Sequence, residues 1–339
     1  GAGEADLRGE ESHPQKSSER MSAPARASLG NLLRWGGTAA TLGLMFYLLT
    51  QQDWDDILAA LRRLAFWQLA TALGLMVVSR LAVAFRWHIL LASGGAQIKA
   101  QQSLQLTFAG LFASNFLPST IGGDVVRLAG TIRLGVDSAL SVASLLTDRL
   151  VGILSMSVTF PLGLYAIGWL PESASPAQAG IITGMVIPTW MGEIVLRAHN
   201  GFKRLWGALQ RWLKHPKMLA ASFFLSFIHM ACLFSVLWIL LDGLGEPLPL
   251  WLAAGLWSFI YLVTLLPISI NGFGLQEVSV AFLFSSIGGV SHQSGLLLAL
   301  LVRTLLMLTS LPGALYLPSI LAETHKHPEL LESGQDGLA

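Results

Sequence analysis

The chain alternates long apolar runs with short polar turns. Nearly charge-free windows cover 35–50, 64–79, 138–170, 218–241, 248–270 and 294–320. A helix needs about 20 apolar residues to cross the hydrocarbon core of a bilayer, which is roughly 30 Å thick, and most of these windows supply that length. The pattern predicts an all-α polytopic membrane protein with about seven to eight transmembrane helices.

The apolar part of the chain is continuous enough to form a single domain. We expect 1–28 to be a disordered polar extension, 29–320 to be one transmembrane domain and 321–339 to be a cytoplasmic tail. The run from Arg34 to Leu49 lacks the cleavage pattern of a signal peptide. It is therefore predicted to be a retained first helix.

Basic residues between the apolar runs predict the orientation in the membrane. Residues 197–217 combine six Lys and Arg with Phe, Leu and Trp at helical spacing, which is typical of an amphipathic helix on an anionic leaflet. The loops 171–178 and 242–249 lack Lys and Arg and are expected outside, with the N-terminus in the cytoplasm. Residues 178–192 form a short apolar stretch. Whether this stretch crosses the membrane decides whether the two halves of the internal repeat described next are inverted or parallel.

Two stretches of the chain resemble each other. FLPSTIGGDVVR at 116–127 and LLPISINGFGLQE at 265–277 each contain Leu-Pro, a Ser, a Gly-containing turn and a charged residue. Each is followed by an arginine inside an apolar run, Arg149 in the first case and Arg303 in the second. The pattern predicts an internal repeat with halves of about 29–170 and 218–320.

The Pro and Gly turns of this repeat interrupt apolar helices. Irregular backbone exposed to lipid is too costly to exist, so such turns must be buried in protein or line a wet cavity. We therefore predict two repeat-related re-entrant helical hairpins, a device that marks the substrate site in many transporters. An ordinary loop between two spans is the alternative. The expected hairpin breaks are Asn115, Pro118, Gly122, Gly123, Pro267, Asn271, Gly272 and Gly274, the asparagines satisfying freed backbone groups.

Charged residues within the apolar runs are the candidate functional groups. Each costs at least about 2.5–3.5 kcal/mol at membrane depth, so it should face the protein interior and find a partner. In one interpretation the arginines hold a lipid phosphate; in the other the ion pairs only lock the hairpins together. The candidate headgroup residues are Arg149, Arg303, Asp124, Arg127, Asp148, Glu277 and Arg80.

Other polar residues of the apolar runs have simpler interpretations. Arg86 and Trp87 are expected to reach the cytoplasmic interface, because long amphipathic side chains place their polar ends in water. His229 is expected to be a hydrogen-bonded packing residue, and Cys232 a small buried hydrophobe.

Several classes of function lack support in the sequence. A net charge of +1 gives no field for nucleic acid, and one cysteine permits no internal disulfide. No metal-binding, nucleotide-binding or hydrolase motif is present, so we expect no metal and no cofactor. Transport would then be passive or driven by a gradient, with Asp124, Asp148 and Glu277 as the candidate proton carriers.

The motifs resemble one known family. LPSTIGGDVVR followed by SVASLLTDRLVG, and LPISINGFGLQE followed by Arg303, are similar to the lysylphosphatidylglycerol synthase transmembrane-region family, from about Leu29 to Ile320. The second motif departs from the family's Gly-Gly-x-Gly-x-Arg-Glu, because Asn271 replaces a glycine and Gln276 replaces the arginine. The resemblance implies flipping of aminoacylated phospholipids across the bacterial inner membrane, or transport of other lipids such as hopanoids.

The leading hypothesis is therefore a lipid transporter of flippase or scramblase type in the bacterial inner membrane. The family's soluble aminoacyl-transferase domain is not in this sequence, so no synthesis of an aminoacyl lipid is expected. One alternative is an intramembrane enzyme acting on a lipid-linked substrate, which needs two carboxylates within reach of one bond. Carboxylates saturated by arginines would disfavour it. The other alternative is a non-catalytic membrane partner that docks a cytoplasmic enzyme through 197–217.

Overall fold

The structure is a computed structural model in which every regular element is a helix among the residues described. These are 62–116, 122–166, 212–265 and 274–318, with the single positions 43, 168 and 320. The predicted all-α class is confirmed for this part of the chain. The polar extension, nearly all of the first predicted span, 178–192, most of 197–217 and the tail from 321 lie outside the described residues.

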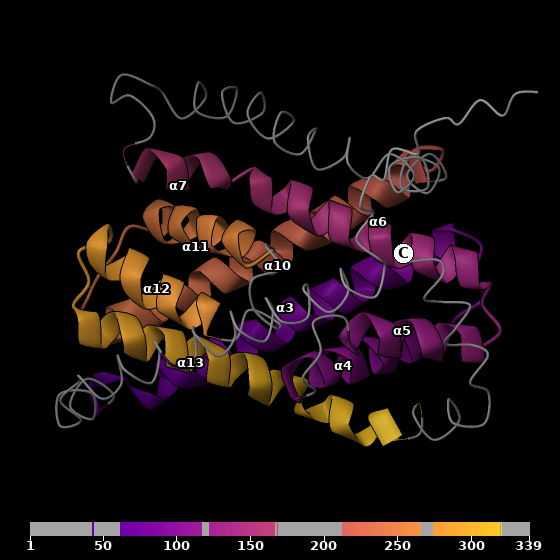
Figure 1. Ribbon diagram of the computed structural model, residues 1–339, viewed down its shortest axis with the longest axis horizontal. Coiled ribbons are helices and arrows are strands. Elements are labelled where there is room, and N and C mark those ends of the chain that lie inside the picture. The colour runs from indigo at the N-terminus through magenta and orange to yellow at the C-terminus, as the bar shows by residue number, and fades with distance from the viewer. Residues whose placement is uncertain are drawn as a thin grey trace, which may run out of the picture.

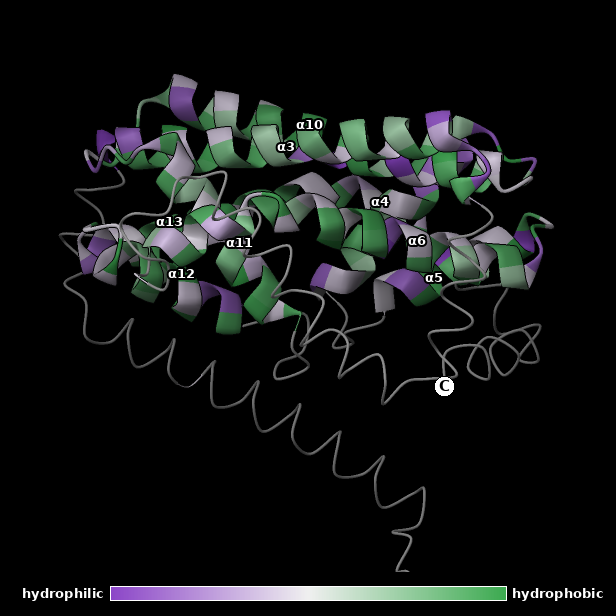
Figure 2. Ribbon diagram, turned by 90° about the horizontal axis from the view of Figure 1, so that it is seen from above, coloured by the Kyte–Doolittle hydropathy of each residue, from purple (hydrophilic) through white to green (hydrophobic). Residues whose placement is uncertain are grey.

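In the described part of the chain, four helices are long and apolar enough to cross a bilayer. They are α3 (Phe66–Ser93), α6 (Ser138–Ser157), α10 (Pro216–Gly243), and α13 (His292–Ser310) continuing into the 3-10 turn η2 (Leu311–Leu315). Hydrophobic residues run along α3 and α10, and hydrophilic ones gather near the ends of this layer (Figure 2). The chain is accordingly a helical membrane protein with several spans.

Five shorter helices complete the described part of the chain. They are α4 (Ala100–Phe116), α5 (Gly122–Arg133), α7 (Phe160–Ala166), α11 (Leu250–Thr264) and α12 (Leu275–Ser286). The long window 138–170 is divided between α6 and α7, with Pro161 in the first turn of α7. Proline is tolerated there because first-turn amides have no partner within the helix.

The two longest helices, α3 and α10, pack against each other in opposite directions. The end of α10 touches the start of α3, where a Cβ on Gly243 would meet Leu64 and Gln68. At the other end, the indole nitrogen of Trp212, just before α10, donates a hydrogen bond to the carbonyl of Leu90 at 2.9 Å. The pair is therefore antiparallel along its length.

The order of helix lengths occurs twice along the chain. The helices α3, α4, α5 and α6 have 28, 17, 12 and 20 residues, and α10, α11, α12 and α13 have 28, 15, 12 and 19. Glycines with positive φ follow corresponding helices, Gly95 and Gly245 after α3 and α10, and Gly135 and Gly289 after α5 and α12. Because only glycine adopts this conformation without strain, the turns as well as the helices correspond.

Four of the short helices form two pairs, α4 with α5 and α11 with α12, on the same face of the layer formed by α3 and α10 (Figure 2). The pair α4 and α5 lies toward one end of the molecule, and α11 and α12 lie toward the other (Figure 1). Within the first pair the backbones nearly touch, since a Cβ on Gly110 would lie 2.7 Å from the carbonyl oxygen of Gly123. Small residues at helix contacts permit this approach in membrane proteins.

The core consists of two main apolar clusters. One is centred on α10, α11 and α13 and includes Leu237 and Phe284; the other joins α3, α4 and α5 around Trp87 and Trp212. Buried serines and threonines of α6, such as Thr147 and Ser155, donate to carbonyls four residues earlier in their own helix. The interior polar groups that remain are mainly the charged residues described next.

Candidate functional site

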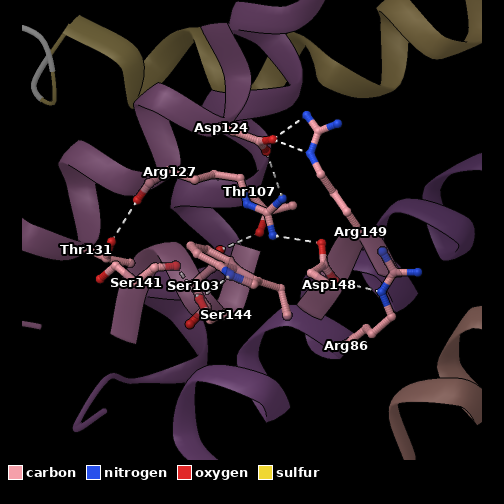
Figure 3. Close-up of polar contacts among 11 residues, drawn as sticks. Arg86, Ser103, Thr107, Asp124, Arg127, Thr131, Ser141, Ser144, Asp148 and Arg149 are labelled. Carbon is pink, nitrogen blue, oxygen red and sulfur yellow. Dashed lines mark hydrogen bonds and ion pairs between the residues drawn. The ribbon is translucent and has the colours of Figure 1, made fainter. Parts of the chain in front are cut away.

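The first ion pair lies at the start of α5. Gly122 begins this helix and Asp124 lies in its first turn, where the helix dipole favours a carboxylate. Arg149 of α6 donates from Nε to Oδ2 of Asp124 at 2.6 Å, and its Nη2 contacts the same oxygen. Figure 3 shows the two side chains pointing toward each other from α5 and α6.

Asp148, the neighbour of Arg149 in sequence, binds two other arginines. Arg86 of α3 donates from Nε to its Oδ1 at 2.7 Å, and Arg127 of α5 donates from Nη2 to its Oδ2 at 3.2 Å (Figure 3). Arg86 also donates to the hydroxyl of Ser226 on α10 at 3.0 Å. One buried carboxylate thus holds three helices together, and a fourth through the serine.

Arg127 occupies the centre of this network. Its guanidinium carbon lies 4.0 Å from the ring centroid of Trp87, within the range of a cation–π interaction. It also approaches Asp124 at 3.5 Å, so it links the two carboxylates. The Trp87 indole nitrogen in turn donates to Ser144 at 3.2 Å.

The second half of the chain carries a corresponding ion pair. The Nε of Arg303 on α13 donates to Oε1 of Glu277 on α12. Asp124 and Glu277 are each the third residue of their helix, and Arg149 and Arg303 are each the twelfth of theirs. The sequence repeat therefore places one carboxylate–arginine pair in each half.

Arg80 lies next to the second pair, close enough to Arg303 for the two guanidinium groups to repel each other. Its Nε is buried and has no hydrogen-bond partner within the described part of the chain, and the same holds for Oε2 of Glu277. Buried polar atoms are nearly always bonded. One arginine atom and one carboxylate atom beside the second pair thus have unmet hydrogen-bonding capacity among the described residues.

The two corresponding pairs differ in exposure. The Arg149 side chain is 55% exposed and that of Asp124 is 21% exposed, whereas Arg303 and Glu277 are 10% and 4% exposed. Arg149 lies in the middle of a membrane-length helix, where an exposed guanidinium must face water or a lipid headgroup. The first pair is open and the second is closed.

Positive charge exceeds negative charge in the arginine cluster, by which we mean the eight charged residues of this region. The five arginines are Arg80, Arg86, Arg127, Arg149 and Arg303, and the three carboxylates are Asp124, Asp148 and Glu277. The excess comes from the first half of the chain, which contributes four arginines and two carboxylates, whereas the second half contributes one of each. Because an uncompensated buried charge is expensive, the cluster is suited to an anion.

The structure corrects the prediction for Arg86. The sequence predicts that it reaches the cytoplasmic interface, but the residue is only 7% exposed and bonds Asp148 and Ser226 in the interior. Trp87, with the same expectation, is fully buried. The missed signal is the position of both residues within α3, several residues before it ends at Ser93.

The remaining candidate residues have varied positions. Asn115 donates to the hydroxyl of Ser310 at 3.0 Å and to the carbonyl of Leu306, so it ties α4 to α13. Gly274 precedes α12 with a φ of 76°. Pro118, Pro267, Asn271 and Gly272 lie outside the described residues. His229 contacts the hydroxyl of Ser79 through Nδ1 at 2.6 Å.

These features define the class: a helical, multi-pass membrane protein with a charged cluster among its apolar helices. The family model for the lysylphosphatidylglycerol synthase TM region matches residues 34–313. The chain belongs to this family. It is also 22% identical over 279 residues to a UPF0104 membrane protein of Archaeoglobus fulgidus, a match that covers 73% of this chain and 84% of the relative.

Proposed function

We propose that the protein is a flippase- or scramblase-like transporter that moves a phospholipid or other polar-headed lipid across the bacterial inner membrane. The observation that carries this proposal is the excess of arginine over carboxylate at the middle of apolar helices. A lipid phosphodiester supplies the missing negative charge, and its acyl chains remain in the bilayer. Membership of a family named for lysylphosphatidylglycerol synthase agrees with a lipid substrate.

In this proposal α4–α5 and α11–α12 are re-entrant hairpins. At 1.5 Å per residue, helices of 12–17 residues reach about 18–26 Å, which is less than the roughly 30 Å of the hydrocarbon core. Each pair would enter the membrane, turn near the cluster and return. With the antiparallel α3 and α10, this makes the halves 29–170 and 218–320 inverted repeats within about seven to eight transmembrane helices.

The open pair marks the proposed entry point for the headgroup. Arg149 is the exposed arginine of the cluster, and Asp124 beside it lies at a helix start, where backbone amides also favour an anion. A phosphate oxygen would compete with Asp124 for the Arg149 guanidinium. Aminoacylated and hopanoid-type lipids fit the same site if they carry a polar head of similar size.

An intramembrane enzyme receives less support. Asp124, Asp148 and Glu277 are each bonded to at least one arginine. A carboxylate held as an anion in this way is poorly suited to donate or accept a proton during a reaction. The other alternative, docking of a cytoplasmic enzyme through 197–217, can be tested by truncating that segment. We expect the truncated protein to keep lipid transport, which would count against docking as the function.

The experiment is a transport assay in proteoliposomes of phosphatidylglycerol and phosphatidylethanolamine that contain fluorescent phosphatidylglycerol. Dithionite bleaches the outer leaflet, and transport exposes the lipid of the inner leaflet. We expect bleaching beyond half of the fluorescence with the wild-type protein and at least about a tenfold slower rate with R149Q, because one charge-assisted contact is worth roughly 1.5–3 kcal/mol.

R62Q is the matched control, since Arg62 is exposed outside the cluster, just before α3. Its transport rate should equal that of the wild type. Wild-type vesicles that bleach no further than empty vesicles, with anionic, zwitterionic and aminoacylated lipids alike, would reject the proposal.

A further inference from the structure

The helix that carries the arginine of each half ends against a short helix of the other half. Helix α6 continues into α7, which packs on α11 of the second half, and α13 continues into η2, which packs on α4 of the first half (Figure 1). Only Val158 and Thr159 separate α6 from α7, and their amides still donate to carbonyls of α6. Because η2 follows α13 directly, both extensions are continuous with their long helices.

The contact between α7 and α11 joins hydroxyl groups and backbones. The hydroxyl of Thr159, just before α7, lies 2.5 Å from that of Ser258 on α11. A Cβ on Gly255 of α11 would lie 2.6 Å from the backbone nitrogen of Gly163 of α7. Backbones packed this closely cannot shift past each other without losing the contact. The end of α6 is therefore attached to the second half.

The contact between η2 and α4 has the same features. Asn115 of α4 donates to the hydroxyl of Ser310 at 3.0 Å and to the carbonyl of Leu306 at 3.4 Å, both at the end of α13. A Cβ on Gly313 of η2 would overlap the carbonyl of Phe108 on α4. We call the contacts α7–α11 and η2–α4 the crossover contacts, because each attaches the end of one half to the other half.

The crossover contacts occupy corresponding positions of the repeat. Thr159 and Gly313 each lie ten residues after the arginine of their own helix. Ser258 and Phe108 are each the ninth residue of their helix, α11 and α4. Thr159 meets Ser258, and Gly313 meets Phe108. The exchange of ends thus follows the symmetry of the two halves.

Each arginine is consequently connected to the short helices of both halves. Arg149 bonds Asp124 of α5 in its own half, while its helix is attached to α11 of the other. Arg303 bonds Glu277 of α12 in its own half, while its helix is attached to α4 of the other. A displacement of either pair of short helices therefore changes the separation of carboxylate and arginine in both ion pairs.

We propose that the crossover contacts make the two ion pairs alternate, so that one is open while the other is closed. The structure contains one such state, because the side chain of Arg149 is 55% exposed and that of Arg303 is 10% exposed. A second state follows when the two halves exchange roles and the same crossover contacts are kept. This inference goes beyond the proposed function, because it concerns the motion of the halves and holds for any ligand of the open pair.

The test measures thiol labelling in detergent-solubilised full-length protein. Val125 follows Asp124 in α5 and is 37% exposed, so V125C in the C232S background reports on the open pair. E277D keeps the charge of the closed pair but shortens its carboxylate side chain. It should therefore favour the state in which that pair is open, and slow the maleimide labelling of V125C at least about fivefold, the lower end of usual coupling between sites. R303K weakens the same pair if E277D does not fold.

A second background tests whether the crossover contact transmits the effect. N115A with G313A removes the hydrogen bonds to the end of α13 and places a Cβ against α4. In this background E277D should change the labelling of V125C by less than about twofold, as expected for independent sites. G74A is the matched control background, because Gly74 has open space around it, and it should keep the full effect. N115A alone should reduce the effect if the double variant does not fold.

The control thiol is R62C, which is exposed just before α3 and outside both contacts. Its labelling rate should be the same in every background, and a change parallel to that of V125C would indicate general loosening and overturn the inference. Unchanged or faster labelling of V125C in E277D and R303K would also overturn it, as would an equal effect with N115A and G313A. A protein that labels as expected but moves no lipid would reject only the proposed function.

Discussion

At the scale of single residues, Asp148 shows how a charge is retained among apolar helices. Its side chain is 4% exposed and each carboxylate oxygen accepts from a different arginine, Arg86 or Arg127. The two arginines would otherwise be buried without a counter-charge, at a cost of several kcal/mol each. Asp124 has a similar arginine contact but is 21% exposed, so water also solvates its carboxylate.

This difference predicts unequal effects of two equivalent substitutions. D148N should destabilise the protein by about 3 kcal/mol, because removing one partner of a buried pair leaves the other charge uncompensated. D124N should cost less than about 1 kcal/mol, the range of exposed pairs. Thermal unfolding in detergent measures both, and an equal loss for the two variants would contradict the description of Asp148 as the central carboxylate.

The candidate charges could be predicted from sequence, but most of their pairing could not. A charge in an apolar run is expensive wherever it lies, so the run alone identifies Arg149, Arg303 and Glu277. The pair of Arg86 and Asp148 joins residues 62 positions apart, and no local pattern reports such a contact. Arg86 follows an apolar run, which is also where an arginine that reaches the interface would lie.

At the scale of elements, the approach of α4 to α5 depends on two glycines. A Cβ on Gly110 would lie 2.7 Å from the carbonyl oxygen of Gly123 and 2.9 Å from Cγ of Arg127. Neither the backbone of α5 nor an arginine bonded to Asp148 can move away freely. The contact therefore couples the packing of this helix pair to the position of the cluster.

G110A is accordingly expected to lower the unfolding temperature and to slow lipid transport, through separation of the helices and displacement of Arg127. The cost should be about 1–3 kcal/mol, the usual effect of overpacking. G74A is the control, because Gly74 lies within α3 with open space around it. Alanine there should stabilise the helix by up to about 1 kcal/mol, and a loss in G74A equal to that in G110A would reject the packing explanation.

Helix ends were predictable from sequence where glycine or proline determines them. Phe116 ends α4 just before Leu-Pro, and Gly274 with positive φ precedes α12. The contact of α4 with η2, which comes from the other end of the chain, was not predictable. It depends on tertiary packing, including a glycine at 313 close to the backbone of Phe108.

At the scale of the whole molecule, the antiparallel α3 and α10 constrain the topology. The start of α3 and the end of α10 must lie at one membrane face, and the end of α3 and the start of α10 at the other. The charge pattern agrees with this grouping: the loop 242–249 at the end of α10 lacks Lys and Arg, whereas Lys99 follows α3 and the basic segment 197–217 leads into α10. The packing is therefore compatible with the expected cytoplasmic position of the basic segments.

Single-cysteine labelling tests this arrangement. The sequence contains one cysteine, Cys232, which is buried, so C232S provides a background without reactive thiols. Four exposed positions mark the helix ends in question: Arg62, Asp242, Lys99 and Lys214. In intact cells a membrane-impermeant maleimide should label R62C and D242C, because both lie at the proposed outer face.

K99C and K214C should react only after the cells are opened, since both lie at the proposed cytoplasmic face. Labelling of K99C and K214C in place of R62C and D242C would reverse the orientation but keep the inverted arrangement. Labelling of R62C together with K214C, or of D242C together with K99C, would require α3 and α10 to run in the same direction. It would remove the inverted arrangement of the two halves.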